Sequence, residues 1–77
     1  MEAKTFKEIW QELSPNQQYE LRDLILKKTG ASTNTFWFWK TGNSVPASPM
    51  VRRAVARVVS SYLSISTTET ALFPRRS

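Results

Sequence analysis

The sequence of 77 residues contains no cysteine and no histidine. Without cysteine there are no disulfides, thiolate metal sites or cysteine nucleophile, and without histidine the usual metal ligand and the usual base near neutral pH are missing. The carboxylates of Glu8, Glu12 and Glu20 lie on amphipathic segments near lysines, as surface charges do, and no nucleophile accompanies them. We therefore expect no enzyme activity, no cofactor, no metal and no small-molecule substrate.

Long apolar runs are also missing. No stretch approaches the roughly 20 apolar residues that a bilayer-spanning helix needs, and the charged first residues lack the apolar region of a signal peptide. We expect a cytoplasmic protein without a membrane partner. Because 40% of the residues are hydrophobic, the chain can form one modest core, so residues 1–74 are expected to be a single domain and residues 75–77 a disordered tail.

Acidic residues are scarce in the second half of the chain. Residues 1–30 carry equal numbers of acidic and basic side chains, whereas Glu69 is the one acidic residue among 31–77, against six basic ones, which accounts for the net charge of +5. A polyanionic partner would meet the second half first. Charge alone leaves nucleic-acid binding and a merely solvated basic surface as equal alternatives.

The apolar periodicity predicts an all-α protein, a compact bundle of four helices at about 6–13, 15–29, 33–41 and 49–63. Thr5 and Glu8 have the spacing of a capping box, and the pairs Ser14-Pro15 and Ser48-Pro49 each place a proline in the first helical turn after a cap. These signals define the starts of the first, second and fourth helices.

Apolar stripes predict the faces that these helices bury. The stripes are Phe6, Ile9, Trp10 and Leu13 on the first helix, Leu21, Leu24 and Ile25 on the second, and Val51, Ala54, Val55, Val58, Val59 and Tyr62 on the fourth. A polar, threonine-rich stretch follows the fourth helix. After it, Leu72 and Phe73 are expected to dock back on the core as a short C-terminal segment.

Gly30, Ala31 and Ser32 separate the second and third helices. A glycine can take the left-handed conformation that closes a helix, and Ser32 can cap the next helix only two residues later. Phe36 and Trp39 then point inward about one turn apart. A glycine at the turn, a cap and inward residues at this spacing are the features of a helix-turn-helix.

The third helix carries an unbroken run of aromatic residues from Phe36 to Trp39. A helix cannot bury four successive positions against a single neighbour, so at least one of these rings must be exposed. With Phe36 and Trp39 assigned to the core, Trp37 and Phe38 have three alternative contacts: DNA, a second copy of the chain, or the C-terminal segment. The sequence leaves these alternatives open.

Residues 25–42, with Pro46 after them, resemble the helix-turn-helix of the phage-repressor and Cro-like (lambda-repressor-like) DNA-binding family. The positions in register with the family pattern are Gly30, Ser32, Phe36, Trp39 and Gly42. The positions that depart from it are Leu26, where alanine is usual, Trp37, where a small residue is usual, and Arg22, where a glutamine usually meets phosphate.

The resemblance implies that residues 33–41 lie in the major groove of double-stranded DNA as a recognition helix. It assigns base contacts to Thr33, Asn34, Trp37 and Phe38, and phosphate contacts to Ser32, Lys40, Asn43 and Ser44. Further phosphate contacts are expected from Arg22, Arg52 and Arg53. Asn34 is the candidate adenine reader, because its amide both donates and accepts hydrogen bonds.

These observations predict a sequence-specific DNA-binding protein: a small transcriptional regulator, of bacterial or phage origin by the resemblance, associated with the nucleoid. A homodimer on a two-fold DNA site is compatible with this prediction. The alternative is a protein-interaction module that keeps the helix-turn-helix scaffold and binds a partner or a second copy through the surface of Trp37 and Phe38.

Overall fold

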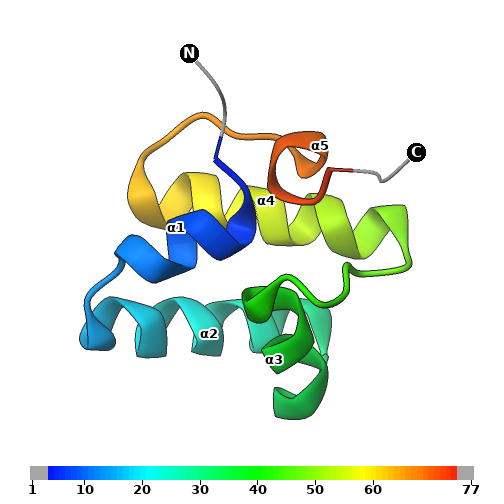
Figure 1. Ribbon diagram of the computed structural model, residues 1–77, viewed down its shortest axis with the longest axis horizontal. Coiled ribbons are helices and arrows are strands. Elements are labelled where there is room, and N and C mark those ends of the chain that lie inside the picture. The colour runs from blue at the N-terminus through cyan, green and yellow to red at the C-terminus, as the bar shows by residue number, and fades with distance from the viewer. Residues whose placement is uncertain (1–3, 75–77) are drawn as a thin grey trace.

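The computed structural model describes residues 4–74, so the tail expected at 75–77 lies outside the described residues. Within 4–74 the chain forms five helices and no strand: α1 (Phe6–Glu12), α2 (Pro15–Thr29), α3 (Thr33–Thr41), α4 (Pro49–Leu63) and α5 (Glu69–Leu72) (Figure 1). The all-α prediction is confirmed. The predicted count of four helices is wrong, because Thr68 accepts a hydrogen bond from the backbone N–H of Ala71 and starts the short additional helix α5.

Local capping explains where the helices begin and end. The predicted capping box of α1 is formed, with the backbone N–H of Thr5 donating to Glu8 at 2.9 Å. α1 ends at Glu12, one residue earlier than predicted, because the backbone of Leu13 is extended (φ −80°, ψ 147°). At the start of α4 the side chain of Ser48 makes no capping hydrogen bond, in contrast to the prediction, so proline alone favours this start.

A cluster of aromatic rings joins α1 to α3. The ring of Phe36 meets those of Phe6 and Trp10 edge-on, with centroid distances of 5.9 and 5.1 Å. Trp39 completes the cluster at 6.3 Å from Phe36. All four side chains are buried, as the sequence predicts for them. α3 therefore packs on α1 more extensively than on α2.

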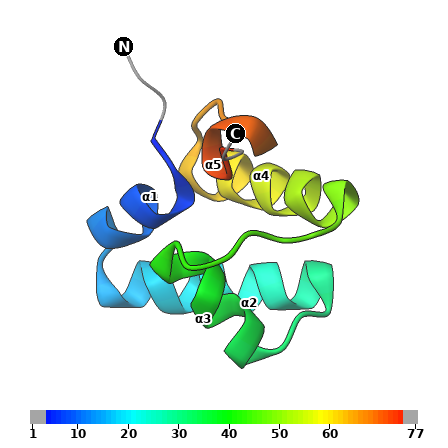
Figure 2. The ribbon, with the colours of Figure 1, turned by 45° about the vertical axis from the view of Figure 1, so that its right-hand side comes forward.

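α2 and α4 pack side by side and run in opposite directions (Figures 1 and 2). Leu21 and Ile25 of α2 are fully buried, together with Val55 and Val59 of α4. Leu24 was predicted to belong to the same buried stripe but is 43% exposed. The reason is that α4 packs on the side of α2 that carries Leu21 and Ile25, which are one turn apart. Leu24 lies at the edge of this contact.

The segment that contains α5 docks on the core, as predicted. Leu72 and Phe73 are 2% and 5% exposed, and the ring of Phe73 lies 5.6 Å from that of Phe6. α5 also packs on α4, where Ala56 is buried although the apolar stripe did not include it (Figure 2). None of the helices described in residues 4–74 is long and apolar enough to cross a membrane.

Candidate nucleic-acid interface

The connection between α2 and α3 is short and held by local hydrogen bonds. Gly30 ends α2 in the left-handed conformation (φ 74°), and its N–H donates to the carbonyl of Leu26 at 2.8 Å. Ser32 caps α3 by accepting from the backbone N–H of Thr35 at 3.1 Å. The two helices are therefore separated by three residues, which fixes the start of α3 next to the end of α2.

The outward face of α3 carries Asn34, Trp37 and Phe38. These residues have i, i+3, i+4 spacing, which places them on one side of a helix. Trp37 is 46% exposed and Phe38 is 39% exposed, and their rings contact each other edge-on with centroids 5.2 Å apart. Asn34 is also exposed. The structure thus brings an amide and two aromatic rings together on one surface, which we call the α3 face.

One of the three alternatives for Trp37 and Phe38 is excluded by the position of the C-terminal segment. Leu72 and Phe73 are buried against the core beside Phe6, and they do not cover the α3 face. The remaining alternatives, DNA and a second copy of the chain, both require an accessible surface. The exposure of the two rings is compatible with either.

The residues that flank the α3 face are exposed at both ends of the helix. At the N-terminal end Thr33 is exposed, and the hydroxyl of Ser32 is bonded to Thr35. At the C-terminal end the backbone N–H groups of Asn43 and Ser44 donate to the carbonyl of Phe38 at 3.1 and 3.2 Å. The side chains of Asn43 and Ser44 remain at the surface, where the sequence prediction requires them.

Two lysines lie at the C-terminal end of α3. The Nζ atom of Lys40 lies over the ring of Trp10, 5.5 Å from its centroid, so this side chain is directed at α1. The side chain of Lys7 lies against Gly42, since a β-carbon on Gly42 would be 3.1 Å from the Cδ atom of Lys7. Lys40 is in the last turn of α3, where a cation is favourable next to the carbonyl end of the helix. Lys7 was not predicted, because nothing in the sequence connects α1 with this loop.

Arg22, predicted to contact phosphate, is half-buried on α2. Its guanidinium lies 4.7 Å from the centroid of the Tyr19 ring, and Tyr19 itself is 67% exposed. The buried Nε atom of Arg22 has no hydrogen-bond partner within residues 4–74. The arginine is therefore held by stacking on an exposed ring, and part of its guanidinium is buried.

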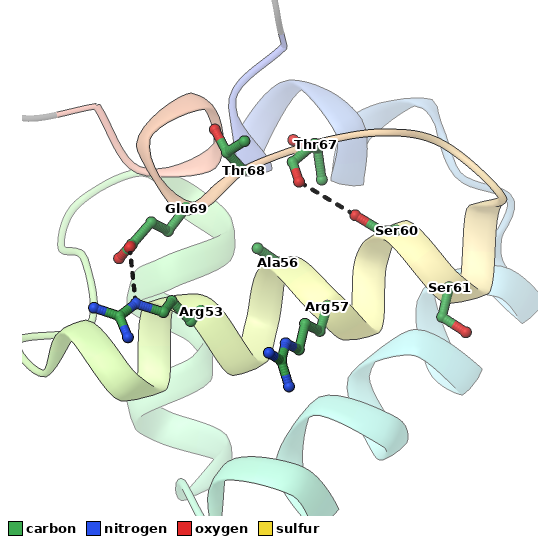
Figure 3. Close-up of a pocket in the computed structure, with 8 residues that line it drawn as sticks. All are labelled: Arg53, Ala56, Arg57, Ser60, Ser61, Thr67, Thr68 and Glu69. Carbon is green, nitrogen blue, oxygen red and sulfur yellow. Dashed lines mark hydrogen bonds and ion pairs between the residues drawn. The ribbon is translucent and has the colours of Figure 1, made fainter.

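Arg52 and Arg53 are engaged by other parts of the chain. The Nη1 atom of Arg52 donates to the carbonyls of Pro46 and Ala47 at 2.7 and 3.1 Å. Glu69 pairs with both arginines, at 3.6 Å from Arg52 and 3.2 Å from Arg53. Figure 3 shows Arg53 of α4 joined to Glu69 at the start of α5. Arg52 lines the same pocket as Asn43 and Ser44, beside the C-terminal end of α3, whereas Arg53 lines a different pocket together with Glu69.

Acidic side chains are absent from the long stretch that contains α3. No Asp or Glu occurs between Asp23 and Glu69. Lys27 and Lys28 occupy the last turn of α2, directly before the turn that leads to α3, and Lys27 pairs with Asp23 at 3.1 Å. Exposed positive charge is thus available near both ends of α3, while α3 itself has no acidic group.

The charges around α3 are arranged for contact with a polyanion. Within residues 4–74 no group of three or more Asp or Glu side chains is placed to hold a metal ion, and the sequence contains no His or Cys.

The chain matches no protein-family model, no curated protein and no solved structure. The function must therefore be inferred from the residues of the α3 face and from the charges around it.

Proposed function

We propose that this protein binds double-stranded DNA sequence-specifically, with α2 and α3 as a helix-turn-helix and α3 as its recognition helix. The observation that carries the proposal is the division of α3 into two faces. Phe36 and Trp39 fix one face to α1, and Asn34, Trp37 and Phe38 are exposed on the other. A rigidly anchored helix with an exposed polar and aromatic face is what major-groove recognition requires.

The dimensions of α3 support this proposal. An α-helix with its side chains is about 10–12 Å wide, and the major groove of B-DNA is about 12 Å wide, so one helix fits into the groove. The nine residues of α3 form between two and three turns. Asn34 lies in the first of these turns, the part of a recognition helix that contacts base edges.

Charge supports the proposal in a second way. Lys27 and Lys28 precede α3, and Lys7 and Lys40 lie near its C-terminal end. Lysines on both sides of a helix in the groove are placed to contact phosphates, which fix the orientation of a protein on DNA and supply affinity independent of sequence. No carboxylate on α3 opposes the approach of the DNA backbone.

The test is fluorescence anisotropy of the full chain with a labelled duplex of mixed sequence, over a range of salt concentrations. We expect the logarithm of the affinity to fall with the logarithm of the salt concentration, with a slope of about −0.9 for each phosphate contacted. The absence of duplex binding at low salt would refute the proposal. Selection of duplexes from a random pool then reveals the preferred sequence and whether it contains two symmetric half-sites, as a homodimeric regulator requires.

A second candidate function is favoured by the contact between Trp37 and Phe38. Two large apolar side chains exposed side by side are typical of protein-binding surfaces, so the α3 face is also suited to bind a partner or a second copy of the chain. Salt dependence separates the two functions, because an aromatic interface responds little to salt. Sedimentation velocity of wild type and Trp37→Ser detects self-association through this face directly.

A further inference from the structure

We propose that the α3 face reads A·T base pairs, with the amide of Asn34 on an adenine and the rings of Trp37 and Phe38 on thymine methyl groups. This inference rests on the proposed function and names the class of DNA sequence that the same surface selects. It follows from which side chains the α3 face contains, which it lacks, and how they are spaced.

Charged side chains are the usual readers of G·C pairs. Guanine is most often read by arginine or lysine, and cytosine by an aspartate or glutamate that accepts from its amino group. α3 contains one charged residue, Lys40, and its Nζ atom lies 5.5 Å from the centroid of the Trp10 ring. Lys40 is thus directed at α1 and away from Asn34 and Trp37. The α3 face therefore lacks the groups that usually select G·C pairs.

Asn34 carries the one amide of the α3 face. A carboxamide donates and accepts at once, which matches the adjacent N6 and N7 atoms of adenine in the major groove. The side chain of Asn34 is exposed, so its amide is accessible to a base edge. Asn43, the other asparagine near α3, differs because its Nδ2 atom already donates to Thr41 at 3.1 Å.

The rings of Trp37 and Phe38 are suited to contact thymine. Thymine is the one base that presents a methyl group in the major groove, and apolar side chains contact it. Trp37 and Phe38 present apolar surface on the same side as Asn34, and their mutual contact limits how far either ring can turn away. Removing one methyl group from water is worth about a fourfold change in affinity. The rings therefore favour thymine over cytosine, which has no such methyl.

The spacing of the three residues fits neighbouring base pairs. One turn of α-helix rises about 5.4 Å, and successive base pairs are about 3.4 Å apart. Asn34 and Phe38 are one turn apart, with Trp37 between them, so the face covers about two adjacent base pairs. An adenine contacted by Asn34 then has a thymine of the next pair within reach of a ring.

The experiment compares three duplexes that differ only in their central half. The first has A·T pairs there, the second has the same pairs with every thymine replaced by uracil, and the third has G·C pairs. Uracil keeps the hydrogen-bonding groups of thymine and lacks its methyl group. We expect the affinity of wild type for the A·T duplex to exceed that for the G·C duplex by about tenfold or more. On the uracil duplex we expect the affinity to fall about fourfold for each methyl group that the protein contacts. Phe38→Ser should bind the thymine and uracil duplexes with more similar affinities, whereas Asn34→Ala should still distinguish them.

A fluorescence measurement adds a second readout on the unmodified protein. Trp10 and Trp39 are 8% and 5% exposed, so a change in tryptophan emission on DNA binding reports mainly on Trp37. We expect this change to be smaller with the uracil duplex at equal saturation. Equal affinities for all three duplexes would overturn this inference and leave the proposed function intact, whereas no salt-sensitive binding to any duplex would refute both.

Discussion

The Nζ atom of Lys40 lies over the indole ring of Trp10, so the one charged side chain of α3 is directed at α1. Trp10 is itself packed against Phe36, which holds α3 on α1. The contacts of Trp10 therefore anchor α3 on α1 and also draw the charge of Lys40 away from the exposed α3 face. What α3 offers to a partner is consequently an amide, hydroxyls and aromatic rings.

The first prediction concerns Asn34. Asn34→Ala removes the amide without touching the core, because Asn34 is exposed. We expect it to lower the preference for one base pair by about 1–3 kcal/mol, since it removes a bidentate contact, and to leave affinity for random DNA nearly unchanged. Competition binding with the selected site and with random DNA measures both quantities. Equal losses on the two DNAs would contradict a base contact.

The second prediction concerns the lysines next to α3. Lys28→Gln should weaken binding to all sequences and reduce the slope of affinity against salt by about one phosphate contact. Arg57→Gln is the matched control, because Arg57 is also exposed but lies on α4, where it lines a pocket with residues of α4 and the segment 67–69 (Figure 3). We expect the control to leave the slope unchanged. If both variants reduced the slope equally, the charge near α3 would have no special role.

The third prediction concerns the two phenylalanines of α3. Phe36 is 1% exposed within the aromatic cluster, so Phe36→Ala should lower the free energy of unfolding by about 3–5 kcal/mol. Phe38→Ala removes the same group from a site that is 39% exposed and should cost less than about 1 kcal/mol. Urea denaturation followed by circular dichroism gives both values, and Phe36→Leu is a milder variant if Phe36→Ala does not fold. Similar losses at the two positions would contradict the packing.

The fourth prediction concerns acid stability. The hydrogen bonds that Thr5 donates, first from its backbone N–H, lower the pKa of Glu8 from its usual 4.5. A carboxyl with a lowered pKa in the folded state stabilises the protein above its unfolded pKa and loses that contribution as the pH falls through the folded value. Melting temperatures measured from neutral pH down to below 4.5 should therefore fall less in Glu8→Gln than in wild type. Parallel curves for the two proteins would argue against the capping box as a source of acid sensitivity.

Most helix boundaries could be predicted because their causes are local. Gly30 and Ser32 mark the turn before α3 by backbone conformation and capping, and both interactions involve residues within four positions. The additional helix α5 was missed because a four-residue helix has too little apolar periodicity to be recognised. Its Thr68 cap was the available signal.

The candidate site was predictable only in part. Asn34, Trp37 and Phe38 follow from the helical period once Phe36 and Trp39 are assigned to the core. The engagement of Arg52 with the carbonyls of Pro46 and Ala47 did not follow, because it depends on how the loop before α4 folds back. Lys7 was missed for a similar reason, since only the packing of α1 on α3 places it beside Gly42.

The sequence by itself therefore determined the four longer helices, the turn between α2 and α3, and the outward face of α3, since each of these depends on neighbours within one or two helical turns. The tertiary structure decided where the charges lie. It directed Lys40 at Trp10, paired Arg53 with Glu69 and docked Phe73 on Phe6, so that Trp37 and Phe38 stayed exposed. These outcomes depend on contacts between residues far apart in the chain, and no local pattern specifies which distant side chain a lysine, an arginine or a ring will meet.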